Sequence, residues 1–224
     1  MFDRRIIGAL GIASALALGA VTQASASPIL GIELQQGIYS FSTTSATDNP
    51  LFVSQSLGTF TTNFEVNNLV TDPLSMDLGS LNVSSSAGGT LTIIASAKDL
   101  TTPDFPGFIS QFSGNFSGAV TSTTLQTYLS GSNTIFGEDT LLSSLSGTGS
   151  PFATSAINAA VASGPFAITE VMTITTSGRA NLSLDGSIAS APEIDAGSGL
   201  AAIALLLGVL GLVGERRRRP AAMA

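Results

Sequence analysis

Between its two ends, the chain alternates apolar and polar side chains with a period of two. β-Branched and aromatic residues are frequent in these segments, and turn-forming residues separate them, as in short antiparallel strands. The predicted strands cover residues 31–42 (with a change of phase at Gly37), 58–66, 74–84, 89–97 and 165–176. The pattern therefore predicts an all-β fold, an antiparallel β-sandwich that is jelly-roll-like or a partly open barrel.

Four further segments refine this prediction. Serines and glycines at residues 84–89 indicate a hairpin-type connection, and two prolines at 97–107 indicate a loop. Residues 107–120 place phenylalanines four apart, as on a helix, but their glycines and serines favour a long strand. Residues 153–163 are compatible with a short helix, although alternating apolar side chains favour a strand.

The apolar faces of these strands identify the expected core. Because side chains two apart on a strand share a face, the core residues lie at alternate positions. The expected core includes Phe60, Phe64, Leu91, Ile93, Phe112, Phe116, Ile168 and Ile174. The chain has no cysteine, so this core has to stabilise the domain without disulfide bonds.

The first 26 residues have the layout of a secretory signal peptide. Two arginines precede an apolar stretch, and the small side chains of Ala24 and Ala26 follow it. Signal peptidase accepts such sites, and cleavage after Ala26 makes Ser27 the first mature residue. A retained membrane anchor is the alternative, but the apolar stretch is short and the cleavage site is well formed.

The charge of the central part restricts its partners. Residues 27–190 contain two basic residues, Lys98 and Arg179, and eleven acids, which gives a net charge of −9. Such a surface repels phosphate groups, so neither nucleic acid nor an anionic membrane surface is an expected partner.

The residue types required by many catalytic sites are missing. The chain has no histidine and no cysteine, which excludes a Ser-His-Asp triad, a thiol nucleophile and the usual zinc ligands. Its only lysine, Lys98, is two residues from Ser96, not the three that place both on one helical face. Glu138 and Asp139 are adjacent acids in a turn-like segment, which indicates turn or solvated residues. We therefore expect no enzyme and no cofactor.

Acids on loops are the remaining candidates for ligand binding. Asp77, Glu138 and Asp139 are candidate Ca²⁺ ligands, together with loop carbonyl groups, although no Asp-x-Asp-x-Asp-Gly loop is present. Sugar sites usually offer aromatic faces, but tryptophan is absent. The two tyrosines, Tyr39 and Tyr128, are expected in the core or at strand edges.

The C-terminal tail has three parts. A Pro-Glu-Ile-Asp segment precedes nineteen uncharged residues, 196–214, and a run of four arginines ends the pattern. As a helix, the uncharged segment spans about 28 Å, close to the hydrocarbon thickness of a bilayer. Basic residues next to a span stay in the cytoplasm, which predicts a central domain outside the membrane. A buried core helix is the alternative, and the adjacent arginines argue against it. The arginines are Arg216, Arg217, Arg218 and Arg219.

This tail resembles the PEP-CTERM family of bacterial surface-sorting signals, in the variant written Val-Pro-Glu-Ile-Asp. The matching residues are Pro192, Glu193, Ile194 and Asp195, and Ala191 stands where valine is usual. The resemblance implies that an exosortase, a membrane-embedded cysteine protease or transpeptidase, recognises the tail. It further implies a Gram-negative bacterium that makes exopolysaccharide.

The sequence therefore predicts three parts. These are a signal peptide at 1–26, a Ser/Thr/Gly-rich β domain at 27–190, and a sorting tail at 191–224 with its motif at 191–195, its transmembrane helix at 196–214 and its basic cytoplasmic end at 215–224. The precursor is expected in the membrane and the mature form at the cell surface or outside the cell.

Two roles remain for the β domain. One is that of a non-catalytic surface or extracellular-matrix protein. The other is that of a module that binds Ca²⁺ or a polysaccharide through acids on loops at one end of the sandwich. A concave face with clustered carboxylates would favour the second role, and scattered carboxylates with a filled interior would favour the first.

Overall fold

The computed structural model describes residues 27–46, 50–71, 74–101, 107–160 and 164–191. These residues form ten β-strands and contain no helix, which confirms the predicted all-β class. Accordingly, the described ranges contain no helix that is long and apolar enough to cross a membrane. The predicted signal helix and the predicted transmembrane helix lie outside the described residues.

All strand pairs are antiparallel. The strands are β1 (Ile29–Gln36), β2 (Tyr39–Ser45), β3 (Leu51–Leu57), β4 (Phe60–Thr71), β5 (Leu74–Ser85), β6 (Gly89–Leu100), β7 (Phe108–Ser130), β8 (Thr140–Gly147), β9 (Phe152–Asn158) and β10 (Phe166–Ser190).

Two long strands, β7 and β10, organise the sheet. They pair with each other from one end to the other, and each has different neighbours along its two halves. On β10, residues 166–176 pair with β6 and residues 180–189 pair with β5. On β7, residues 123–129 pair with β8 and residues 108–114 pair with β9. The two halves of each long strand therefore belong to different layers.

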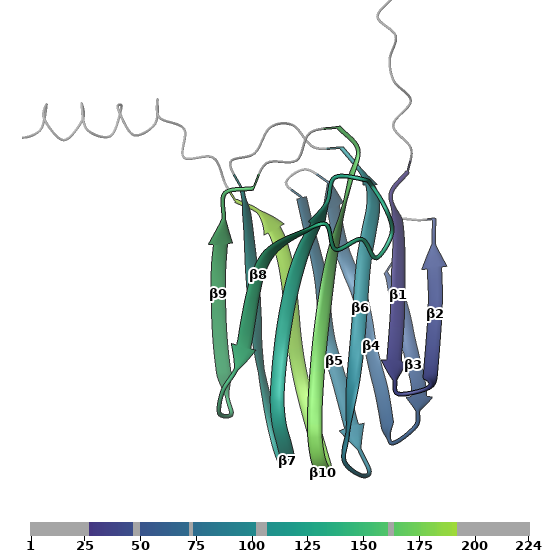
Figure 1. Ribbon diagram of the computed structural model, residues 1–224, viewed down its shortest axis with the longest axis vertical. Helices are drawn as coiled ribbons and strands as arrows, with labels where there is room; N and C mark the ends of the chain where they lie inside the picture. Colours follow the sequence, from purple (N-terminus) through teal and green to yellow (C-terminus); the bar gives the residue numbers. More distant parts are fainter. Residues whose placement is uncertain (1–26, 47–49, 72–73, 102–106, 161–163, 192–224) are drawn as a thin grey trace, which may run out of the picture.

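The sheet folds over where the β7–β10 ladder shifts, between Thr176 and Ala180 (Figure 1). The first layer consists of β2, β1, β6 and the 166–176 part of β10, followed by the second half of β7 and β8. The second layer consists of β3, β4, β5 and the 180–190 part of β10, followed by the first half of β7 and β9. At the open sides β2 approaches β3 and β8 approaches β9, so the sandwich is nearly closed, like a barrel.

Apolar side chains fill the space between the layers. The predicted core residues Phe60, Phe64, Leu91, Ile93, Phe112, Ile168 and Ile174 are all buried, and Phe116 is partly buried against this core. The ring of Phe152 on β9 contacts Phe112 edge-on, with a centroid distance of 4.8 Å. The long strand predicted at 107–120 is also confirmed, and β7 continues to Ser130.

The structure corrects several predicted strand boundaries and connections. Residues 31–42 form two strands, because Gly37, with a φ of 57°, turns the chain into a β1–β2 hairpin. Residues 84–89 do not close a hairpin, because β10 lies between β5 and β6 in the sheet. This connection crosses from the second layer to the first. Strands β3 and β8, and the part of β10 beyond residue 176, were not predicted.

The other two segments were predicted in part. The segment 97–107 is not entirely a loop, because β6 continues to Leu100. The segment 153–163 contains β9, which ends at Asn158. Ile157 points outward with 75% of its surface exposed, so the inward face of β9 is the one with Phe152 and Ala156.

Both ends of the described chain lie at the same end of the sandwich, here called the tail end (Figure 1). Strand β1 starts there and β10 finishes there, and the backbone N–H of Ala191 donates to the carbonyl oxygen of Gly107 at 2.8 Å. The opposite end, here called the far end, contains the β1–β2 and β3–β4 hairpins and the bend in β7 and β10.

The bend predicts a specific sensitivity at Gly118. Its φ is +86°, and a Cβ atom there would overlap the carbonyl oxygen of Arg179. Strain in the left-handed region together with this overlap should make Gly118→Ala cost about 2–4 kcal/mol of unfolding free energy. Urea unfolding of the full chain in detergent measures this loss.

Gly131→Ala is the matched control, because open space surrounds Gly131. Its unfolding free energy should stay within about 0.5 kcal/mol of the parent. Equal stability of the two variants would show that the bend does not depend on Gly118.

Candidate functional site

A carboxyl group lies inside the sandwich. Glu170 follows Ile168 and precedes Met172 on the inward face of β10, and its side chain is fully buried. Neither of its carboxyl oxygens has a hydrogen-bond partner among the described residues. Gly186 leaves space for this group, since a Cβ atom at that position would lie 3.3 Å from Oε2.

Burial raises the pKa of Glu170 well above its usual value, and the negative charges of Asp77 and Asp185 raise it further. The backbone of Ile188 lowers the pKa of Glu170 by a smaller amount. It forms no hydrogen bond to either carboxyl oxygen of Glu170. An uncharged carboxyl is the form that an apolar interior tolerates. Glu170 is therefore a buried carboxyl whose uncharged form is favoured, and no ligand in solution can reach it directly.

Three more acids lie on the second layer, near the irregularity in the ladder between β5 and β10. They are Asp77 on β5, Asp185 on β10 and Glu65 on β4. Burial, followed by the charges of Asp185 and Glu65, raises the pKa of Asp77 to about 6. The Asp77 carboxylate packs over Gly79, where an added Cβ atom would lie 3.3 Å from both oxygens. Burial also raises the pKa of Asp185.

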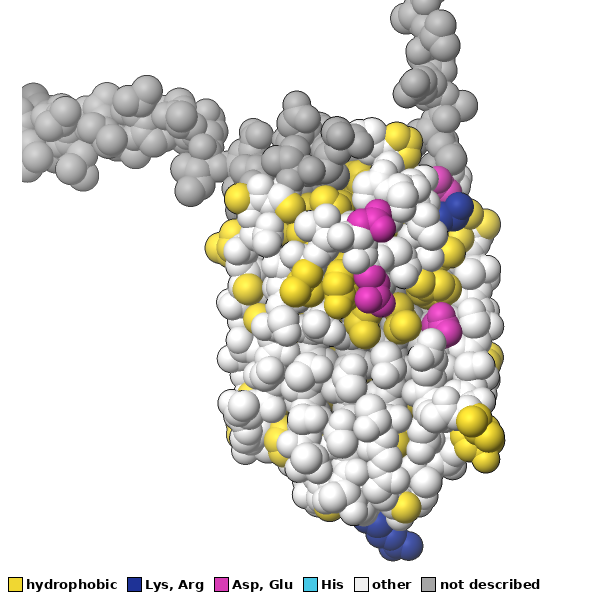
Figure 2. All heavy atoms as spheres, in the orientation of Figure 1, with side chains coloured by type: hydrophobic (Ala, Val, Ile, Leu, Met, Phe, Trp, Pro, Cys, Tyr) yellow, Lys and Arg dark blue, Asp and Glu magenta, His cyan; other side chains and the backbone are white. Residues whose placement is uncertain are grey.

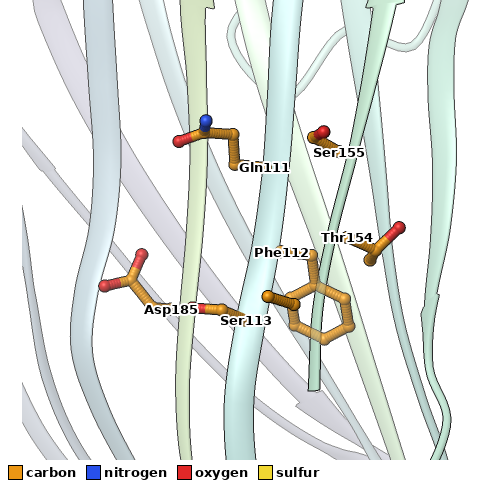
Figure 3. A pocket seen from close by; sticks show the side chains of 7 residues that line it. Gln111, Phe112, Ser113, Thr154, Ser155 and Asp185 are labelled. Atoms are coloured by element: carbon orange, nitrogen blue, oxygen red, sulfur yellow. The ribbon is translucent and has the colours of Figure 1, made fainter.

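A groove of about 450 Å³ lies beside Asp185 (Figure 3). Gln111 and Ser113 line it from β7, and Ser155 lines it from β9. Asp185 pairs with Ser113 across the β7–β10 ladder. The groove thus offers one carboxylate among hydroxyl and amide groups. In the described part of the chain, no group of three or more acids is arranged to hold a metal ion.

The other predicted acids lie in the β7–β8 connection. Asp139 Oδ2 accepts hydrogen bonds from the hydroxyl groups of Ser130 and Ser132, both at 2.9 Å, and from the backbone N–H of Ser132 at 3.2 Å. These bonds lower the pKa of Asp139. Asp139 therefore stabilises the β7–β8 connection through these hydrogen bonds, and Glu138 precedes it in the same connection. Asp77 belongs to the other layer, so the structure does not bring the three Ca²⁺ candidates together.

The remaining predicted site residues lie at or beyond the ends of the described chain. Ser27 is the first described residue and is exposed, and Ala191 is the last. The described ranges do not include Ala24, Ala26, the Pro192–Asp195 motif or the four arginines, so their roles stay predictions.

Charged residues gather toward the tail end of the described sandwich (Figure 2). At the far end, Arg179, beside the β10 bend, is the only charged residue among the described ones. Between these regions the outer surface of the second layer is neutral. A second groove, of about 260 Å³, lies on that surface and is lined by Thr61, Asn63, Asn82 and Asn181 among others.

Sequence reasoning did not single out Glu170, Asp185 or Glu65. For Glu170 a signal was present, because it shares the strand phase of the apolar residues Ile168 and Met172. No local signal connects Asp185 with Asp77, since strand pairing between distant segments brings them together.

Comparison with known families identifies the tail. The model of the VPEID-CTERM protein sorting domain matches residues 191–221 and confirms the resemblance drawn from the sequence. Such a domain indicates a surface protein that is exported as a membrane-anchored precursor and sorted by an exosortase-type enzyme. No curated protein matches the chain. The match begins at Ala191, immediately after β10 ends.

The buried acid predicts an unusual pH dependence of stability. The pKa of Glu170 is higher in the folded than in the unfolded chain, so its stabilising contribution is complete below the unfolded pKa and is lost as pH rises through the folded pKa. Across that window, stability should fall by up to about 1.4 kcal/mol per pH unit. Glu170→Gln should largely remove this slope, and a remaining slope near pH 6 would belong to Asp77.

Thermal unfolding of the full chain in detergent from pH 4 to 8 measures the slope. Glu33→Gln is the control, because it makes the same change at a partly exposed position of β1. It should retain the parent slope. A parent protein whose melting temperature rises steadily with pH would contradict the assignment.

Proposed function

We propose that this chain is a non-catalytic protein of the cell surface or extracellular matrix, delivered there by its sorting tail. The observation that carries this proposal is that the matched sorting domain begins at Ala191, directly after the last strand of a filled β-sandwich. The host that such a signal implies is a Gram-negative bacterium that makes exopolysaccharide.

The acids support a non-catalytic role. A pair of carboxyl groups in a glycosidase has to reach the substrate from both sides of the bond that breaks. Glu170 is enclosed by the core, and the Asp77 oxygen Oδ1 is buried without a hydrogen-bond partner. Asp185 is the exposed acid of the groove in Figure 3 and has no histidine or cysteine to act with it.

The positions of the two chain ends support display of the far end. Because β1 begins and β10 finishes at the tail end, a membrane span after Ala191 directs that end toward the membrane. The far end of the sandwich, where Arg179 is the only charged residue among the described ones, then points away from the cell. This orientation is part of the proposal.

A binding module for a polysaccharide is the second candidate, and the neutral surface of the second layer favours it. Calcium binding has less support, since Asp77 is on a different layer from Glu138 and Asp139. The acids near the tail end are divided between the interior, the second layer, strand β6 and the β7–β8 loop.

Export predicts the first residue of the mature protein. Cleavage after Ala26 leaves Ser27, two residues before β1 begins, so the domain loses no strand. Mass spectrometry of the surface-located protein should find Ser27 at its N-terminus. Recovery of Met1 on that protein would show that the N-terminal segment is retained.

Sorting predicts that the motif, and not the apolar span alone, is recognised. Proline fixes the backbone and keeps the preceding residue extended, a form that a protease cleft accepts. The double variant Pro192→Ala/Glu193→Ala should insert into the membrane normally and keep its full-length tail. Mass spectrometry of the C-terminus distinguishes the processed from the unprocessed chain.

Glu215→Ala is the control, because it changes an acid beyond the span and leaves the motif intact. It should be processed like the parent. If the double variant is also trimmed and delivered normally, residues 192–195 are only a linker.

A further inference from the structure

The outer surface of the second layer contains two adjacent rows of neutral polar side chains, here called the polar face. Strand pairing places the members of each row side by side. The first row is Ser56, Thr61, Ser84, Asn181 and Ser117. The second row is Ser54, Asn63, Asn82, Ser183 and Asn115. Ser183 is partly exposed, and all the others are exposed.

Much of the hydrogen-bonding capacity of this face is unused. Among the described residues, the side chains of Asn63, Ser84 and Asn181 have no hydrogen-bond partner in the protein. The Asn82 amide donates to the carbonyl oxygen of Ser80 at 3.0 Å and keeps its side-chain oxygen as an acceptor. An asparagine amide offers two donors and an acceptor, and a hydroxyl offers both functions. The face can therefore exchange hydrogen bonds in both directions with a ligand.

The groove of about 260 Å³ lies on these two rows. Asn63 and Asn82 line it side by side from β4 and β5, and Asn181 lines it from β10. Neighbouring strands lie about 4.8 Å apart, and side chains two apart on one strand lie about 6.8 Å apart. This spacing gives a regular array of donors and acceptors that a repeating ligand can follow.

The carboxylates on the tail side of the polar face disfavour an anionic ligand there, and Arg179, two residues before Asn181, is the one described charge on the opposite side. The two rows contain no ionisable side chain. On the side toward the tail end, the next positions include Glu65 on β4 and Asp185 on β10, and Asp77 lies beside them. These carboxylates repel a polyanion that extends beyond the rows, whereas a chain of neutral hydroxyl groups meets no such penalty.

We propose that the polar face binds a neutral polysaccharide chain, with Asn63, Asn82 and Asn181 as its main hydrogen-bonding residues. This inference rests on the proposed role at the cell surface and names the ligand class and the site. Each hydrogen bond to a hydroxyl group contributes little beyond what water offers, and no aromatic ring lies in the two rows. Binding is therefore weak per sugar unit and is strengthened when many copies engage one polymer.

The test is affinity electrophoresis of the full chain in detergent, through native gels that contain dextran, hydroxyethyl cellulose or alginate. The parent should be retarded by at least one of the two neutral polymers and not by alginate. Retardation should be unchanged between low salt and 0.3 M salt, because no ion pair contributes. Asn63→Ala/Asn181→Ala removes two side chains of the groove and should weaken retention about tenfold.

Thr90→Ala/Ser122→Ala is the matched control, since both side chains are exposed on the outer surface of the first layer. It should be retained like the parent. Equal retention of the two double variants, or the absence of retention in both neutral polymers, would overturn the proposed site. Salt-sensitive retention by alginate alone would instead assign binding to a charged surface such as that around Arg179.

A mobility that changes with protein concentration in polymer-free gels would identify a second copy of the chain as the occupant, and it would also overturn the proposal. The sorting role is judged separately from the processed C-terminus. Normal processing without polymer binding overturns only the inference about the polar face. Failure of processing in the parent overturns the proposed function itself.

Discussion

The continuous pairing of β7 with β10 is the constraint on which the rest of the structure depends. Both strands pass through both layers, so one ladder sets the position of each layer relative to the other. It also divides the remaining strands, because β6 and β8 flank only the halves in the first layer, and β5 and β9 only those in the second. Gly118 permits the bend that this arrangement needs.

The same ladder determines where function can lie. Because β10 passes through both layers, it returns to the end of the sandwich at which β1 starts, and the sorting domain follows at Ala191. Except for Arg179, the described charges lie toward that end, while two rows of hydroxyl and amide groups cross the second layer nearer the far end. In the proposed function, delivery and contact with the surroundings would therefore involve opposite ends of the sandwich.

The buried carboxyl of Glu170 makes the stability of the core depend on pH. Its side chain shares the inward row of β10 with Ile168 and Met172, and Gly186 in the facing layer leaves room for it. A carboxyl without a hydrogen-bond partner destabilises an apolar core once it is ionised. Asp77 and Asp185 increase this effect from the second layer. The domain is therefore expected to be most stable at mildly acidic pH.

The sequence by itself determined the features that depend on neighbouring residues. Alternation of apolar side chains identified most of the strands and core residues such as Phe60 and Ile174, and the tail was recognisable because its signal is a linear motif. Only the tertiary structure decided that residues 84–89 connect two layers and that Asp77 lies near Asp185. The physical reason is that β10, distant in sequence, inserts between β5 and β6, and local alternation carries no information about which distant strand completes a sheet.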